Sequence, residues 1–586
     1  MKNVRVKIEE KVLKQKKLTI ETGLYAAAFL VGALIRFYRL GSLPLGDSEA
    51  SLALQALSLA NGDLPPLGSL ASYLGITKLF FSLFEASPFL ARLWPALIGS
   101  LLILTPALFR DLLGKGPATI LSFGLALDGL LIAASRQVSG EILAVTFFLA
   151  GIGFFYNKAY AWSGISLAMA LMSGPAFPQG IIIVLLIILV NRLLIKDNLF
   201  QIDSSAPPTG LTEVQKKWLV YWTLGTFLFF GTQFFTLPQV IGGSFQNIPE
   251  YLRGWSVSSG VNAGLLLVAV LSYELFPLIF GLIGTVWPFQ RSDRTQKILN
   301  LWLFFALLLF VVYPGRQILG LVWLVIPLWA LASRSLFGIF SSIEKNSQIV
   351  SVLLAGLVLV LLIFAVLNLS ALTNEASDNF TTGLSGDQVK WIRIVGALVV
   401  SALVVTLVAW GWSVDSAMKG LCFALAVFTF VFTLSSSWNA AGLGRHPEAE
   451  LSRVDGGILE ADLFLKTIED HVEWNKYSQP DLQIVVVDVP SPSVKWAMRH
   501  LPRVQDSAFL PGDSEPGIIV TQDEETLMLA SSYSGQNFIW GQQTNWSLIL
   551  PREWLSWLFF REAPKESEVL VVWVRSDLFP GAEETN

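Results

Sequence analysis

The chain has 586 residues and a formal net charge of −4, and 53% of its residues are hydrophobic whereas only 14% are charged. This charge balance gives no reason to expect a nucleic-acid partner. The single cysteine, Cys422, excludes an internal disulfide framework. The three histidines, His446, His471 and His500, all lie near the C-terminus, which excludes a histidine-rich metal site in the apolar part of the chain.

Residues 1–18 form a strongly basic tail, and the first long apolar run follows at about 20–38. Acidic residues in this region, Glu9, Glu10 and Glu21, do not fit a cleavable signal peptide. We therefore expect a retained first membrane helix with a cytoplasmic N-terminus. A solvated, disordered tail is an alternative description of residues 1–18 that is compatible with this topology.

Twelve further apolar runs follow the first one. A helix of about 20 apolar residues crosses the hydrocarbon core of a membrane. The runs are continuous and not alternating, which excludes a barrel. They lie at about 93–110, 116–134, 141–157, 160–173, 180–195, 217–236, 263–287, 298–313, 317–333, 349–370, 391–411 and 418–436. The sequence thus predicts a mainly α, polytopic membrane domain over 19–436 with about 13 transmembrane helices.

The charges of the connecting segments predict the topology. Lys and Arg gather in every second connection, whereas connections such as 40–77 and 173–180 are poor in them. Basic connections stay in the cytoplasm, so an odd number of helices places the C-terminal part outside.

Two further regions differ in composition from the long apolar runs. The first outer segment contains two amphipathic runs between residues 47 and 85, which suit helices lying in the membrane interface. From residue 437 charges return and the apolar runs shorten to strand length, as in Leu482–Val489 and Glu568–Arg575. We expect 437–586 to form a small soluble α/β domain outside the cell.

The first outer segment also holds two carboxylates, Asp47 and Glu49. In a structural interpretation Asp47 is the N-cap of a helix that ends at Gly62, with Glu49 in its first turn. In a functional interpretation, a carboxylate at the membrane surface removes a proton from an acceptor hydroxyl.

Two later outer turns carry arginine. Arg136 and Glu141 bound one turn, where they could form an ion pair or bind a phosphate and an acceptor or metal. Arg316 follows Tyr313-Pro-Gly and could extend to the membrane interface or contact an anionic lipid head group.

Two carboxylates lie inside apolar runs, Asp128 and Glu274. Charges within the membrane are costly, so such residues indicate either function or a buried partner. Asp128 lies about two turns before Arg136 and is expected to line the same cavity. A hydrogen-bonded structural role is equally open for Glu274.

Four segments in this order carry a resemblance to a known family. They are RFYRLGSLPLGDSEA at 36–50, SPFLARLWPALIGSLL at 87–102, SRQVSGE at 135–141 and YPGRQILGLVWLVIPLWALA at 313–332. Together they resemble the GT-C superfamily of polyprenyl-phosphate-sugar-dependent glycosyltransferases. Within it, they are most similar to the branch of protein O-mannosyltransferases and the lipid A aminoarabinose transferase, and to its flippase-activity-associated subset in bacteria and archaea.

The resemblance implies roles for individual residues. Asp47 matches the first-loop base, Glu141 matches the acidic residue of the second outer loop, and Arg136 precedes it as in the family. Arg316 would contact the donor phosphate, and Asp128 would line the substrate cavity. The family usually has adjacent Asp and Glu, whereas here Ser48 separates Asp47 from Glu49, which turns Glu49 to another helix face.

The implied protein is an inverting glycosyltransferase of a prokaryotic plasma membrane. Its partners would be a polyprenyl-phosphate sugar donor, membrane lipids and a protein, lipid or glycan acceptor. A divalent metal is left open as a cofactor, with Asp47 and Glu141 as its ligands. Two other functions are compatible with the sequence: an accessory protein in lipid-linked-sugar transport, and a catalytically silent GT-C-fold subunit of a membrane complex.

Overall fold

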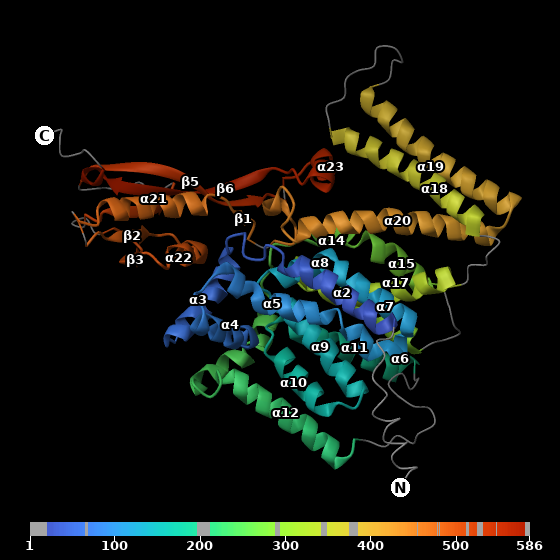
Figure 1. Ribbon diagram of the computed structural model, residues 1–586, viewed down its shortest axis with the longest axis horizontal. Helices are drawn as coiled ribbons and strands as arrows, with labels where there is room; N and C mark the ends of the chain where they lie inside the picture. Colours follow the sequence, from blue (N-terminus) through green and yellow to red (C-terminus); the bar gives the residue numbers. More distant parts are fainter. Residues whose placement is uncertain are drawn as a thin grey trace, which may run out of the picture.

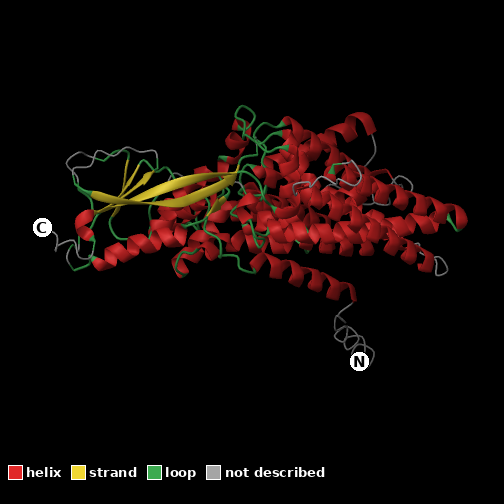
Figure 2. Cartoon of the chain, turned by 90° about the horizontal axis from the view of Figure 1, so that it is seen from above, coloured by secondary structure: helices red, strands yellow, loops and turns green. Residues whose placement is uncertain are grey.

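A computed structural model shows a helical bundle joined to a smaller sheet-containing domain (Figure 1). It describes residues 20–579 except for 65–67, 196–210, 287–293, 342–347, 374–384, 454, 478, 480, 511–514, 524–530 and 547. The basic tail expected at 1–18 lies outside the described residues. The strands gather at one end of the molecule and the helices make up the rest (Figure 2).

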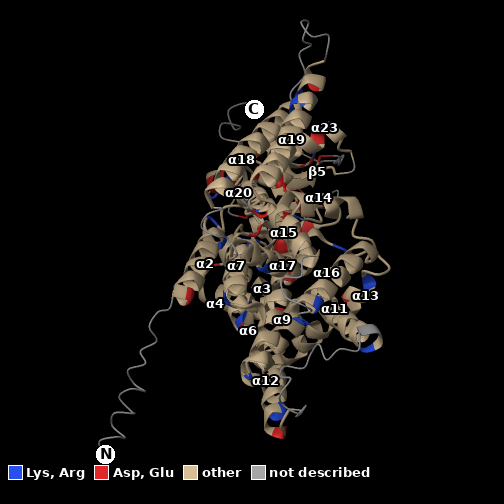
Figure 3. Ribbon diagram, turned by 90° about the vertical axis from the view of Figure 1, so that its right-hand side faces the viewer, with Lys and Arg blue, Asp and Glu red and all other residues tan. Residues whose placement is uncertain are grey.

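Each of the thirteen apolar runs forms helix, and most of the helix surface is uncharged (Figure 3). The bundle consists of α2 (Ile20–Phe37), α5 (Pro88–Leu102), α6 (Arg110–Leu113), α7 (Lys115–Leu127), α8 (Gly129–Arg136), α9 (Gly140–Tyr156), α10 (Tyr160–Leu171), α11 (Ala176–Val190), α12 (Glu213–Gly231), α13 (Asn247–Arg253), α14 (Ala263–Tyr273), α15 (Leu275–Val286), α16 (Arg294–Val312), α17 (Val322–Ser341), α18 (Gln348–Ser370), α19 (Gly386–Gly411) and α20 (Val414–Ala440). In the described part, eight helices are long and apolar enough to cross a membrane, or up to ten if each of two bent pairs is one span. The chain is a multi-pass membrane protein, and the count of thirteen spans is not confirmed.

Two of the runs that hydropathy predicts as single helices are broken at a position occupied by a carboxylate residue. The first bends by 54° between α7 and α8, where Asp128 adopts an extended backbone and caps α8 through Leu131 N. The second bends by 96° at Glu274, between α14 and α15. Pro277 contributes to this break because it has no N–H to donate to the carbonyl of Tyr273.

The interior of the bundle is organised around α17. Its side chains are buried over most of its length, and it packs against α7, α15 and α16. The aromatic rings of Trp323 and Trp329 fill this interior, where Phe148 contacts the first edge-on and Phe276 stacks on the second. A close-packed centre of this kind holds the outer turns at fixed positions.

The segment between α2 and α5, predicted to lie outside, forms two short helices, α3 (Asp47–Asn61) and α4 (Ala71–Leu83), which pack against each other. Gly62 ends α3 with φ of 93°, a conformation that favours glycine, as the sequence predicts. The N-cap of α3 is Gly46, with no side-chain cap bond, so the expected N-cap role of Asp47 is wrong.

The C-terminal domain has one mixed sheet of strand order β1-β5-β6-β4-β2-β3. Its elements are β1 (Gly457–Ile458), α21 (Ala461–Trp474), β2 (Ile484–Val487), α22 (Pro492–Met498), β3 (Val504–Ser507), β4 (Ile518–Gln522), β5 (Tyr533–Thr544), α23 (Pro551–Phe560) and β6 (Lys565–Arg575). Strands β2, β3 and β4 are parallel, whereas β6 pairs antiparallel with β4 and β5. Phe464 and Ile468 of α21 pack on the sheet in a core separate from that of the bundle, which confirms the small α/β domain.

Candidate active site

Asp47 is the first residue of α3, and its carboxylate binds the C-terminal domain. Its Oδ1 accepts hydrogen bonds from Ser491 Oγ (2.7 Å) and from the backbone N–H of Ser493 (2.9 Å) in the first turn of α22. Trp540 Nε1 in turn donates to Ser493 Oγ at 3.0 Å. Among the described residues, Oδ2 of Asp47 has no hydrogen-bond partner, and the side chain is half-buried. One oxygen is therefore fixed and the other is available.

Ser48, the residue that separates the two carboxylates, also contacts the C-terminal domain. Asp455 Oδ2 accepts from both the backbone N–H (2.8 Å) and Oγ (2.5 Å) of Ser48. A Cβ at Gly46 would lie 2.6 Å from this oxygen, so a larger residue there would displace the Asp455 side chain. Burial raises the pKa of Asp455, although the two bonds from Ser48 oppose the rise.

Glu49 is buried in an ion pair with Arg92 of α5, and their exposed fractions are 7% and 2%. The guanidinium donates to both carboxylate oxygens, at 2.9 Å and 2.5 Å, and Val138 N donates to Oε1 at 2.9 Å. Burial alone would raise the pKa of Glu49, but Arg92 and the Val138 amide hold it below its usual value. Both oxygens are thus occupied, and Glu49 joins three separate segments of the chain.

Arg136 ends α8 and is also buried, with 7% of its surface exposed. Its Nε donates to the carbonyl of Ala441 at 2.6 Å. Its Nη1 donates to the carbonyls of Ile35, Arg36 and Tyr38 at 2.9, 2.9 and 2.8 Å. The side chain therefore joins the end of α2 to the segment that follows α20.

Glu141 lies in the first turn of α9 and is half-buried. No direct hydrogen bond or ion pair in the described part of the chain joins it to Asp47. The hydrogen bond from Val138 N to Glu49 instead links the turn before Glu141 to the first turn of α3. A Cβ on Gly140 would lie 2.4 Å from the carbonyl oxygen of Ser173, so the close approach of α9 to this segment requires glycine.

Arg316 belongs to a separate set of contacts. Its Nε donates to the carbonyl of Val261 at 2.8 Å, and its Nη1 donates to that of Val311 at 2.7 Å. Within the described residues no hydrogen bond or ion pair connects it to Asp47, Glu49 or Arg136. The 3-10 turn that follows, η4 (Ile318–Leu321), packs against α8.

Asp128 is fully buried and lies at the break between α7 and α8. Its Oδ1 accepts from Leu131 N at 2.8 Å and its Oδ2 from Trp329 Nε1 at 2.6 Å. Glu274, also fully buried, lies beside it at the break between α14 and α15. The two breaks thus meet inside the bundle, and Asp128 binds the backbone of α8 and the side chain of Trp329, which is a structural role.

Several residues around Asp47 were not assigned a role by the sequence patterns. Arg92 lies inside the quoted segment 87–102, yet a single sequence shows no partner for it. The Ser491-Pro492 pair is a recognisable helix start, with an N-cap serine and proline at the first helical position. Its contact with Asp47 spans 444 positions, which no local pattern encodes.

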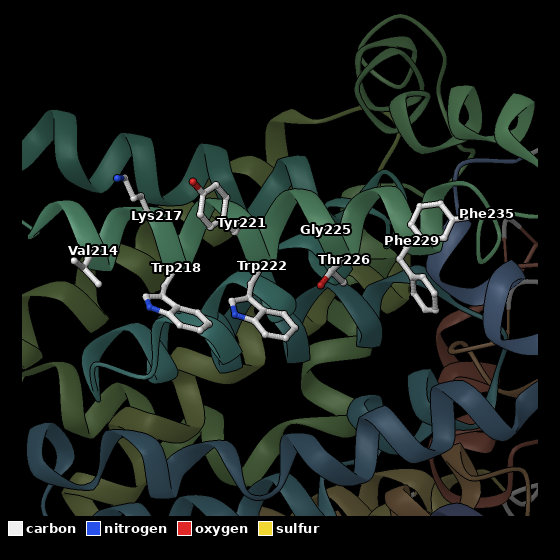
Figure 4. Close-up of a pocket in the computed structure, with 9 residues that line it drawn as sticks. All are labelled: Val214, Lys217, Trp218, Tyr221, Trp222, Gly225, Thr226, Phe229 and Phe235. Atoms are coloured by element: carbon white, nitrogen blue, oxygen red, sulfur yellow. The ribbon is translucent and has the colours of Figure 1, made fainter.

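A groove of about 760 Å³ lies along α12 (Figure 4). Trp218, Tyr221 and Trp222 line it, together with Phe229 and Phe235. None of the predicted site residues contributes to it. Such an apolar, aromatic surface on a peripheral helix suits contact with membrane lipid.

No family model matches the chain, and no curated protein sequence matches it. Two solved structures of ArnT from Cupriavidus metallidurans are similar in fold. The one bound to undecaprenyl phosphate has a TM-score of 0.54 at 13% identity, with 96% of this chain and 99% of that chain covered. The apo form has a TM-score of 0.51 at 14% identity, with 94% and 98% covered. This chain has the GT-C fold.

Asp47 and Glu49 lie in the first turn of α3, in the segment between α2 and α5. The bonds of Glu49 to Arg92 and Val138 join this segment to α5 and to the turn before Glu141, whereas Arg136 binds carbonyls at the end of α2. Among the described residues, no group of three or more His, Cys, Asp or Glu side chains could hold a metal ion. Asp47 and Glu141 by themselves do not form a fitting metal site, and we derive no step through a metal.

Proposed function

We propose that this chain is an integral-membrane glycosyltransferase that moves a sugar from a polyprenyl-phosphate donor to an acceptor hydroxyl outside the cell. The observation that carries the proposal is the fold shared with ArnT bound to undecaprenyl phosphate over nearly the full length of both chains. The outer-loop carboxylate Asp47, with one oxygen available, supplies the base that such a reaction needs.

In the proposed reaction, Asp47 Oδ2 removes the proton from the acceptor hydroxyl. The acceptor oxygen forms a bond to the anomeric carbon as the bond from that carbon to the phosphate oxygen breaks. The electron pair leaves with the lipid phosphate, and a single displacement inverts the anomeric centre. Ser491 and Ser493 hold Oδ1, which orients the free oxygen.

Arginines supply the positive charge that the leaving phosphate requires. The Nη2 of Arg316 has no hydrogen-bond partner among the described residues, and the side chain is half-buried, so it suits contact with the donor phosphate. Arg136 and Glu49 then act as positioning residues, because their polar atoms are committed to the protein. Glu141 faces the acceptor side in this proposal, and Asp128 supports the helix that ends at Arg136.

The experiment is Asp47→Asn in the purified protein in lipid nanodiscs. Asparagine keeps an oxygen acceptor for Ser491 and Ser493 but is a very weak base. The probe donors are polyprenyl-phosphate mannose and polyprenyl-phosphate aminoarabinose. The variant should release at least 100-fold less lipid phosphate, which is the lower end of a general-base contribution, while its Tm stays unchanged. Asp63→Asn, at the exposed far end of α3, is the matched control and should keep full activity. Normal turnover by the Asp47 variant would overturn the proposal.

A catalytically silent GT-C subunit is the second candidate. It is favoured by the use of Asp47 Oδ1 and both Glu49 oxygens in internal contacts. It predicts no release of lipid phosphate by the unchanged protein from any polyprenyl-phosphate sugar, together with partner chains that purify with it.

A further inference from the structure

Three arginines converge on a small cavity outside the proposed reaction centre. Arg92, Arg136 and Arg453 line it, together with Gln137 and the apolar side chains of the first outer loop. They come from α5, from the end of α8 and from the segment that follows α20. The cavity has a volume of about 10 Å³, which is room for about one water-sized particle.

The charge of Arg92 is already neutralised within the protein. Glu49 accepts from its Nε and Nη2, and the carbonyls of Leu43 and Pro44 accept at 2.7 Å and 2.9 Å. Arg92 therefore lines the cavity without adding an unpaired charge.

Arg136 has hydrogen bonds but no counter-charge. Its hydrogen-bond partners among the described residues are all backbone carbonyls, and no carboxylate of these residues forms an ion pair with it. Carbonyl oxygens satisfy the N–H groups of a guanidinium but carry no net charge to balance it.

Arg453 has neither a hydrogen bond nor an ion pair from its side chain among the described residues. The acidic residues around it have other partners. Glu450 pairs with Arg561 at 2.6 Å, and Glu448 pairs with Lys565 at 2.8 Å. The pKa of Arg453 is lowered to about 10, mainly by burial and then by Arg92, while Glu49 and these two carboxylates oppose the change.

Two more carboxylates lie nearby, and neither reaches the arginines. Asp47 is held by Ser491 and Ser493, and Asp455 is held by Ser48. The cavity is thus bordered by two guanidinium groups, those of Arg136 and Arg453, without an anion in contact. Arg136 is buried and Arg453 is half-buried. Unpaired charge at such a site is costly, because charges withdrawn from water are normally paired.

We propose that this cavity binds one monatomic anion, chloride under physiological conditions, between Arg136 and Arg453. The size of the cavity favours a halide because a phosphate group occupies several times the space of one water molecule. Binding there joins the C-terminal domain to the first outer loop and to α8. The proposal does not depend on the glycosyltransferase activity, since neither arginine is placed in contact with the sugar.

The experiment compares the Tm of the full chain in nanodiscs with sodium chloride and with sodium gluconate at matched ionic strength. Chloride should raise the Tm by several degrees in a saturable manner. Arg453→Gln should lose this dependence, because it removes the unpaired charge. The matched control is Arg445→Gln, which changes an exposed arginine eight positions earlier and should respond to chloride as the unchanged protein does.

A second measurement covers the case in which the Arg453 variant folds poorly. Crystals of the unchanged protein grown with bromide should show an anomalous peak between Arg136 and Arg453. Absence of that peak, or an equal Tm in the two salts, would overturn the proposal. A larger Tm rise with inorganic phosphate than with chloride would also overturn it, because it would indicate a polyatomic ligand.

Discussion

Asp47 is the first residue of α3, but its carboxylate binds the first turn of α22. Its residue type and position predict an N-cap, yet Gly46 occupies that position and the carboxylate accepts from the first turn of α22 instead. The sequence identifies the carboxylates at 47 and 49 because they follow a membrane helix in a familiar segment. Their partners, Ser491 and Arg92, could not be predicted because both contacts depend on the packed structure.

The buried ion pair of Glu49 and Arg92 should make a large contribution to the free energy of unfolding. Removing one partner of a buried ion pair leaves an uncompensated charge and typically costs about 3 to 5 kcal/mol. Glu49→Gln should therefore lower the free energy of unfolding by about this amount, measured by denaturation in detergent. Glu213→Gln, in the exposed pair with Lys216, is the control and should change it by less than about 1 kcal/mol.

The pKa of Glu49 adds a test by pH. Because its folded-state pKa lies below the ordinary value, its contribution is fully present above that value and is lost as pH falls through the folded-state pKa. The Glu49 variant should lose less stability than the unchanged protein on acidification below about pH 4.3. Parallel acid unfolding of the two proteins would show that the ion pair does not contribute.

Among the elements, hydropathy predicts where helices form but not where they break. All thirteen apolar runs correspond to helices, because length and continuous apolar character determine that choice. The breaks at Asp128 and Glu274 arise from a side-chain cap and from Pro277, which a hydropathy window averages out. The short strands β1 and β3 and the helix α23 were also not predicted, since their sequences lack a long apolar run.

The break between α7 and α8 depends on the side chain of Asp128. Asp128→Ala should lower stability by about 1 to 3 kcal/mol, because it removes the cap of α8 and leaves the buried Trp329 N–H without an acceptor. Asp128→Asn keeps an oxygen for the cap and should cost less. Tm in detergent and tryptophan fluorescence measure the two effects. Equal loss in both variants would instead indicate that the negative charge of Asp128 matters more than its hydrogen bonds.

For the whole molecule, the sequence predicts two domains but not the polar interface between them. Tyr273 of the bundle donates to Glu450, which also pairs with Arg561 of the C-terminal domain. At the other end of the interface, Arg499 Nη2 donates to the carbonyl of Ala86 at 2.8 Å. These contacts couple the C-terminal domain to α14 and to the segment between α4 and α5.

The interface itself can be tested by weakening both of its contacts with the first turn of α3. The double variant Ser491→Ala and Asp455→Ala removes hydrogen bonds to Asp47 and Ser48, each worth about 0.5 to 1.5 kcal/mol. Hydrogen exchange in α3 and α22 should therefore become faster while exchange in α17 stays unchanged, because only the interface opens. Asp506→Ala breaks an exposed ion pair with Lys495 inside the C-terminal domain and should leave exchange in α3 unaffected. If the double variant exchanges like the unchanged protein, the domain is held by its contacts at Glu450 and Arg499, and the coupling to Asp47 proposed here would be wrong.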